Sequence, residues 1–161
     1  MNAGNKENQT QRSPSGYRKN LKGRYIVACL ILLTSFSHSH FAAEPQIIIN
    51  PLLDINNITR SKARSIFSMR LYQWADGTPV VVYVLPDDSS QHRLFVQNIL
   101  SMFPHQLRRQ WDRYTYTGIG QAPIEVTDEQ EMIERVNSTL GAIGYIEKGA
   151  SDAKIRRLNI E

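Results

Sequence analysis

The sequence predicts a single α/β domain over residues 44–161, arranged as a three-layer α/β sandwich. The main observation is Val80–Leu85, an apolar and largely β-branched run between two prolines, which is typical of a strand buried on both faces. Asp87–Ser90 follows with four residues that favour helix starts, and apolar residues then recur at helical spacing. Because further strand and helix patterns flank this unit with short connections, we expect the order β-α-β-α-α-α-β-β.

Before the central strand, the pattern predicts a strand, a helix and a turn. Gln46–Asn50 is a short apolar strand, and a helix is expected over Arg60–Met69. The buried stripe of this helix consists of Ala63, Ile66 and Phe67. We expect the basic residues on or beside the opposite face to be in contact with solvent: Arg60, Lys62, Arg64 and Arg70. Trp74–Gly77 reads as a turn, since Asp-Gly tolerates positive φ.

After the central strand, a helix is expected over Asp88–Met102. Pro104 suits the first position of the next helix, in which Leu107 and Trp111 are spaced to face the core. The remaining basic residues of this helix, Arg108, Arg109 and Arg113, are expected to face water.

Three patterns complete the chain. Thr127–Gln130 has the form of a capping box and predicts a helix that buries Met132, Ile133 and Val136. Gly141–Ile146 reads as a strand whose glycines permit close backbone approach. Lys154–Ile160 is expected to add an edge strand.

Charge is distributed unevenly along the chain. Of the 19 Lys and Arg residues, six precede residue 44, where there is a single acid, Glu7. The remainder therefore holds 13 bases against 14 acids and is close to neutral. The net charge of +4 consequently gives no support to nucleic-acid binding.

Residues 1–43 have the composition of a disordered basic extension followed by a signal peptide. Met1–Gly16 lacks an apolar period, basic residues follow, and Tyr25–Phe36 is an apolar run. The small residues Ala42 and Ala43 then mark the expected cleavage site. This run is shorter than the ~20 residues that span a bilayer. We expect export to the periplasm, with an uncleaved inner-membrane anchor as the alternative.

The residue types that support metal or covalent chemistry are sparse. Cys29 is the only cysteine, and neither His92 nor His105 has a partner at metal-ligand spacing, so no metal or other cofactor is expected. His92 lies three residues after Ser89, but no Gly-x-Ser-x-Gly sequence surrounds this serine and no acid is placed to orient the histidine. We therefore expect His92 to be an exposed helical residue and the protein not to be an enzyme.

Five segments together resemble a known family. They are Ser65–Phe67, Trp74–Gly77, Asp87–Leu100, Tyr116–Gly118 and Gly141–Tyr145. In this order they resemble the phosphate-binding-protein-like branch of the type 2 periplasmic binding proteins, the solute receptors of ABC importers. The resemblance covers one lobe, whereas full-length receptors of the family close two lobes around a ligand.

The resemblance implies a ligand site at the start of the helix after the central strand. The family's Ser-Gly-Thr falls on Ser89, Ser90 and Gln91, and the family's arginine falls on Leu85. Without that guanidinium, and with aspartates at positions 87 and 88, phosphate or another small anion is expected to bind only weakly. An inner-membrane transporter or sensor is the partner that the family implies.

Two functions therefore stand as alternatives. The first is an exported solute-binding-like domain with weak or partner-dependent recognition of an anion or small ligand. The second is an envelope interaction or sensory module on the same scaffold, in which the serines at positions 89 and 90 only cap the helix. Its docking surface would comprise Trp74, His92, Trp111, Tyr114 and Tyr116.

Overall fold

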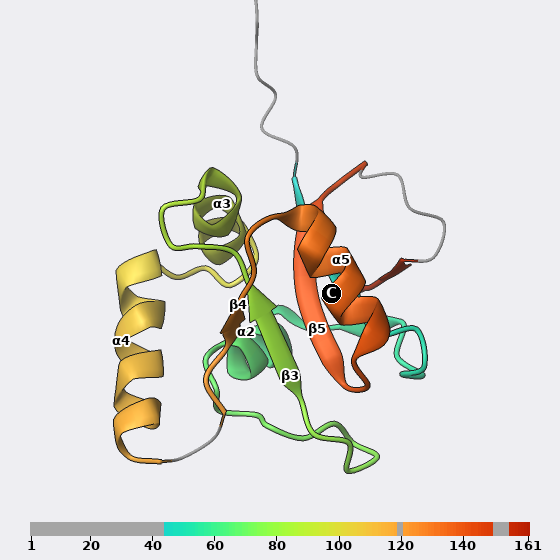
Figure 1. The fold of residues 1–161 in the computed structure, drawn as a ribbon, viewed down its shortest axis with the longest axis horizontal. Coiled ribbons are helices and arrows are strands. Elements are labelled where there is room, and N and C mark those ends of the chain that lie inside the picture. The colour runs from blue at the N-terminus through green and yellow to red at the C-terminus, as the bar shows by residue number, and fades with distance from the viewer. Residues whose placement is uncertain (1–43, 119–120, 150–154) are drawn as a thin grey trace, which may run out of the picture. The chain divides into compact units, whose positions relative to one another are not determined.

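A computed structural model describes residues 44–118, 121–149 and 155–161 (Figure 1). The predicted extension and signal peptide, residues 1–43, lie outside the described residues. The elements are β1 (Pro45–Ile49), β2 (Asn57–Ile58), α2 (Arg60–Phe67), β3 (Val81–Val84), α3 (Ser90–Asn98), α4 (Pro104–Tyr116), β4 (Ile124–Glu125), α5 (Glu129–Ser138), β5 (Ala142–Glu147), β6 (Arg156–Arg157) and β7 (Asn159–Ile160). No helix in these described ranges is long and apolar enough to cross a membrane.

A mixed five-stranded sheet forms the centre of the domain, in the order β4-β3-β5-β1-β6. Strand β3 runs parallel to both of its neighbours, β4 and β5, whereas β1 is antiparallel to β5 and β6. The pairing of Val82 with Ile143 shows that the two predicted apolar strands belong to one sheet, in which they are neighbours. A separate parallel pair, β2 and β7, was not predicted because each strand has only two residues.

Helices cover both faces of the sheet, which confirms the three-layer α/β sandwich. Alternate residues of β5 point to opposite layers. At Gly144 the strand lies against Met132 and Val136 of α5, and a Cβ there would come within 2.4 Å of the Met132 sulfur. Tyr145 faces the other layer, where its ring stacks on Phe95 of α3 at 3.9 Å. Figure 1 shows α5 on the near side of the sheet and α2 on the far side.

Two helices end earlier than the sequence predicted. Helix α2 stops at Phe67 and α3 at Asn98, because Met69 and Ser101 adopt positive φ angles of 61° and 51°. An α-helix cannot continue through the left-handed region. Neither residue is glycine, so the usual sequence signal for a helix end was absent.

The basic residues of α2 are not simply a solvated face. Arg60 and Arg64 reach the end of α3, where they donate hydrogen bonds to the carbonyl oxygens of Asn98 and Leu100 at 2.5 and 2.6 Å. The last carbonyls of a helix have no partner within it, and cations near them are favourable. These arginines therefore join α2 to α3 in the layer that carries the site described below.

The turn at Trp74–Gly77 is confirmed. The Thr78 amide donates to the Asp76 carboxylate at 2.9 Å, and Gly77 has a φ of 85°. The Trp74 indole N–H donates to the Gly141 carbonyl at 2.9 Å, so the turn is attached to the start of β5. The turn thereby fixes the chain just before the central strand.

Two further predictions were wrong in detail. Helix α5 is capped by Asp128 rather than Thr127, because the Asp128 carboxylate accepts the Glu131 amide while the Glu131 side chain accepts from Thr127, both at 2.9 Å. The N-cap thus lies one residue later than predicted. The expected C-terminal edge strand is divided into β6 and β7, which belong to different sheets.

Candidate functional site

The candidate site lies where β3 ends and α3 begins. Ser89 is the N-cap of α3, and its hydroxyl accepts a hydrogen bond from the His92 amide at 3.4 Å. Ser90 and Gln91 are the first two residues of the helix. The structure thus brings the three predicted residues together at the carboxyl end of an interior strand, where helix N–H groups commonly face a ligand.

Leu85 takes no part in the exposed surface of this site. Its side chain is 2% exposed and belongs to the hydrophobic core. Its backbone amide donates to the Tyr145 hydroxyl at 2.9 Å. Position 85, onto which the sequence resemblance aligns the family's arginine, is therefore an apolar core position here.

His92 is buried, contrary to the sequence prediction of an exposed helical residue. It is 1% exposed and lies on the same face of α3 as Phe95 and Val96. Its Nδ1 lies 2.6 Å from the Tyr145 hydroxyl. The hydroxyl accepts from Leu85, and among the described residues Nδ1 is the one acceptor found for its proton. We therefore assign the hydroxyl proton to the bond with Nδ1, which places the imidazole proton on Nε2.

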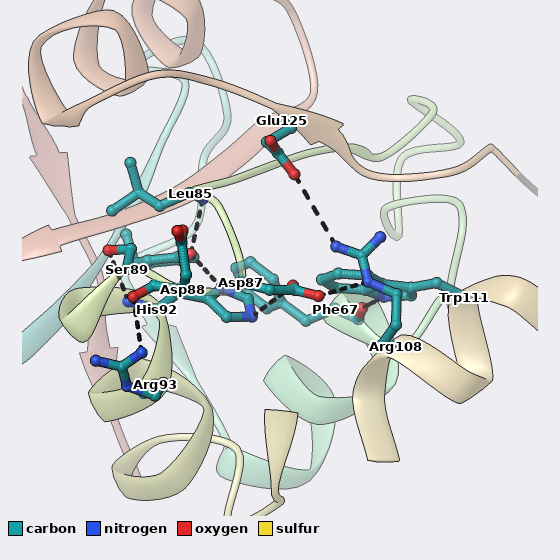
Figure 2. A network of polar contacts seen from close by, with 11 residues as sticks. Phe67, Leu85, Asp87, Asp88, Ser89, His92, Arg93, Arg108, Trp111 and Glu125 are labelled. Carbon is teal, nitrogen blue, oxygen red and sulfur yellow. Dashed lines mark hydrogen bonds and ion pairs between the residues drawn. The ribbon is translucent and has the colours of Figure 1, made fainter. Parts of the chain in front are cut away.

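Asp87 and Arg108 form an ion pair beside this histidine. The Asp87 Oδ2 lies 2.7 Å from the Arg108 Nε, and the other carboxylate oxygen lies 3.6 Å from the His92 Nε2 (Figure 2). The sequence prediction had placed no acid beside His92 and had Arg108 facing water. The first prediction was wrong and the second held only in part, since the Arg108 side chain is 41% exposed. The chain reverses between α3 and α4, which brings Arg108 back over the turn that holds Asp87.

Two other side chains hold Arg108 in place. Its guanidinium lies over the Trp111 ring at 4.9 Å from the centroid, and its terminal nitrogen is 4.0 Å from a Glu125 carboxylate oxygen. The Trp111 indole N–H donates to the Phe67 carbonyl at 2.7 Å, which fixes the ring. Arg108 therefore rests on a rigid aromatic surface.

Two polar atoms at this site lack hydrogen bonds. Within the part of the chain that the structure describes, the Asp87 Oδ1 and the His92 Nε2 are buried and have no hydrogen-bond partner. They face each other at 3.6 Å, which is too long for a hydrogen bond. An unsatisfied buried donor costs on the order of 1–3 kcal/mol, so this contact is an incomplete one.

The surroundings determine the charge of each group. The hydrogen bond from Arg108 holds the pKa of Asp87 below its usual range. Burial lowers the pKa of His92, and the nearby Asp87 opposes that shift. Burial also raises the pKa of Tyr145. Near neutral pH the site therefore contains a matched pair of charges, with His92 and Tyr145 uncharged.

A hollow of about 370 Å³ opens beside the ion pair, between α4 and β4. Arg108, Trp111, Tyr116 and Glu125 are among its lining residues. Tyr116 is 91% exposed at its rim. The hollow gives solvent and small molecules access to the Arg108 side of the site.

The arrangement does not resemble a hydrolytic triad. The Ser89 hydroxyl is bonded to a backbone amide, and the His92 ring is bonded to Tyr145 rather than to a serine. Over residues 44–118, 121–149 and 155–161, no group of three His, Cys, Asp or Glu side chains could hold a metal ion. What the geometry offers is hydrogen-bond donors at a helix start and a salt bridge, which are means of binding.

The aromatic docking surface predicted for the alternative function is not present. Trp74 and Trp111 are each 3% exposed, because each indole N–H donates to a backbone carbonyl within the domain. His92 is also buried. The burial of Trp111 confirms the core position that its helical spacing predicted. Of the five residues predicted for the docking surface, Tyr116 is the one that is fully exposed.

Comparisons with known proteins bear on the fold. No family model and no curated protein matches the sequence. Solved structures do match: an ABC-type phosphate transport receptor from Vibrio cholerae aligns with a TM-score of 0.58 at 15% identity, over 73% of this chain and 46% of that one. PstS from Borrelia burgdorferi aligns with a TM-score of 0.57 at 19% identity, over 74% and 47%. A Clostridium perfringens structure with bound phosphate aligns at 0.58 and 16% identity, over 73% and 45%.

This chain has the fold of one substrate-binding-protein lobe. The resemblance inferred from the sequence is thereby confirmed at the level of fold. The chain spans less than half the length of the three structures. Identities of 15–19% carry no residue roles from those proteins to this one.

Arg108, Tyr145 and Glu125 were missed as site residues. Arg108 is 21 residues from Asp87, and Tyr145 is 53 residues from His92. No local spacing relates residues so far apart in sequence. The one usable signal was the position of His92 on the apolar face of its helix, three residues before Phe95.

Proposed function

We propose that this chain is an exported solute-binding-like lobe that recognises a small ligand weakly, or together with a partner that supplies the second wall of a cleft. The observation that carries the proposal is the start of α3 at the carboxyl end of interior strand β3, on a fold shared with lobes of phosphate receptors. Ser89, Ser90 and Gln91 are the ligand-binding residues in this proposal. An inner-membrane transporter or sensor is the partner that such a lobe would serve.

The same site supports weak rather than tight binding of phosphate. Leu85 is buried at the position where the family resemblance implies an arginine, and Arg108 is already paired with Asp87. A helix terminus alone contributes about 0.3–1 kcal/mol to anion binding when exposed. We expect a phosphate dissociation constant no tighter than roughly millimolar, which corresponds to about 4 kcal/mol.

An NMR titration of the exported protein with phosphate, sulfate and carboxylates at constant ionic strength tests this function. Saturable amide shifts centred on Ser89, Ser90 and Gln91 are the expected result. The Ser89→Gly variant removes the hydroxyl but retains most of the capping stability, so it should weaken binding without unfolding α3. Ser138→Ala, at the end of α5, is the control.

Two results would count against this function. Small shifts spread evenly over the surface would mean that no ligand site exists at the start of α3. A micromolar constant abolished by Ser89→Gly would instead mean that a group other than Arg108 replaces the missing arginine, and that the chain is a tight receptor.

Export is the second part of the proposal. It is motivated by the basic segment and the apolar run Tyr25–Phe36 in the sequence. Fractionation of cells should place the protein in the periplasm with a new N-terminus near Ala43 or Glu44. A full-length species in the cytosol would contradict export, and a full-length species in the inner membrane would indicate the uncleaved anchor.

A further inference from the structure

Two hydrogen-bond donors from different helices flank the carboxylate of Asp87. The Arg108 Nε from α4 lies 2.7 Å from one oxygen, and the His92 Nε2 from α3 lies 3.6 Å from the other. Figure 2 shows Asp87 between these two side chains. A cation and a neutral N–H that converge on one carboxylate are the elements of a small anion site.

Each donor also has contacts that do not involve Asp87. The Tyr145 hydroxyl fixes the His92 ring at 2.6 Å, and the imidazole is 1% exposed. Arg108 rests on Trp111, which is itself held by the Phe67 carbonyl. Removal of the Asp87 side chain would therefore leave a preformed cradle, in which both donors lack their acceptor.

The Asp87 side chain fills this cradle incompletely. Its short tether lets one oxygen reach Arg108, but the other stops beyond hydrogen-bond distance from the buried His92 Nε2, which has no partner among the described residues. A free anion in the same place is not tethered to the backbone. It could move to satisfy both donors.

The geometry points to Asp87 as a built-in anion that occupies a small-oxyanion site formed by Arg108 and His92 and thereby excludes free anions from this edge of the sheet. Asp87 is then the residue that determines the specificity of the lobe. This inference rests on the proposed function, for which it explains the expected weakness toward phosphate. It also favours an uncharged or cationic solute as the ligand of the unmodified protein.

The test removes the built-in anion and supplies a free one. Asp87→Ala and the smaller polar change Asp87→Ser are titrated with formate and with phosphate at constant ionic strength. Thermal unfolding and the NMR signals of the His92 ring and the Arg108 side chain are followed. We expect a saturable rise in unfolding temperature and a gain in anion affinity of at least about tenfold over the unmodified protein, as for one recovered charge-assisted hydrogen bond.

Controls make the result specific to the cradle. Asp88→Ala removes the neighbouring carboxylate, which is exposed, and should show no comparable gain. Asp87→Ala combined with Arg108→Gln should lose the gain, because the cationic donor is then absent. Binding of formate at Arg108 and His92 in both position 87 variants would support the inference.

A gain no larger than that of Asp88→Ala would overturn the inference. Failure of both position 87 variants to fold even with formate or phosphate present would also overturn it, since a refilled cradle should restore the fold. The readout is independent of the amide shifts at the start of α3 in the unmodified protein. The proposed function and the anion cradle can therefore fail separately.

Discussion

Burial of His92 makes the stability of the domain depend on pH. Its pKa is lowered in the folded protein by burial, Asp87 acts in the opposite direction, and Arg108 adds to the lowering. Its ring also has the uncharged Tyr145 hydroxyl as a hydrogen-bond partner. In the unfolded chain, the pKa returns to about 6.5. Below that pH the unfolded state binds a proton that the folded state does not, so folding stability decreases.

We therefore expect the contribution of His92 to the free energy of unfolding to be constant above about pH 6.5. Below that pH the contribution should decrease as the pH falls toward the lowered pKa of the folded state. The slope for one proton is at most about 1.4 kcal/mol per pH unit. Urea unfolding over this range measures it. His92→Gln should flatten the curve between about pH 6.5 and 5, whereas His105→Gln, on the exposed surface of α4, should not. Equal slopes for all three proteins would show that His92 does not control this transition.

At the scale of elements, Gly141 joins α5 to β5 at a point where no side chain fits. Its φ is 78°, and a Cβ added there would lie 2.0 Å from the Pro79 carbonyl oxygen. Its own carbonyl accepts from the Trp74 indole and from the Val81 amide at 2.9 and 3.1 Å. The turn before the central strand and the start of β5 therefore depend on this glycine.

Gly141→Ala should lower the free energy of unfolding by roughly 3 kcal/mol or more, because backbone strain and a backbone clash coincide. Gly77→Ala is a matched control. Its φ is 85°, but an added Cβ meets nothing within 4 Å, so about 1–2 kcal/mol of strain is expected. Chemical denaturation of both variants gives the comparison. A Gly141→Ala loss no larger than that of Gly77→Ala would mean that β5 can shift to accept the side chain.

At the scale of the whole domain, the two interior strands should be the most protected region. Strand β3 lies between β4 and β5, and β5 lies between β3 and β1, with helices on both faces. Amide hydrogen exchange should be slowest at Val82–Val84 and Ile143–Ile146, where exchange requires global unfolding. The edge strand β6 should exchange faster. Fast exchange across Val82–Val84 would contradict the architecture described here.

Much of this architecture was accessible from the sequence. The apolar run Val80–Leu85, the capping residue Ser89 and the spacing of Leu107 and Trp111 each report a local preference, and the structure confirms a strand, an N-cap and a buried helix face at these places. Hydrophobic period and capping act over a few residues, so they can be read without the fold. The helix ends near Met69 and Ser101 could not be read, because the residues at positive φ there are not glycine.

The chemistry of the site was decided by tertiary structure alone. The sequence indicated that a helix starts near Asp87–Ser90 and that position 85 is not an arginine. Only the fold brought Arg108 to Asp87 and Tyr145 to His92, across 21 and 53 residues. Burial then determined the protonation of His92, and the pairing determined that the nearby cation is already neutralised. Ionisation depends on distances and desolvation in three dimensions, which the order of residues along the chain does not specify.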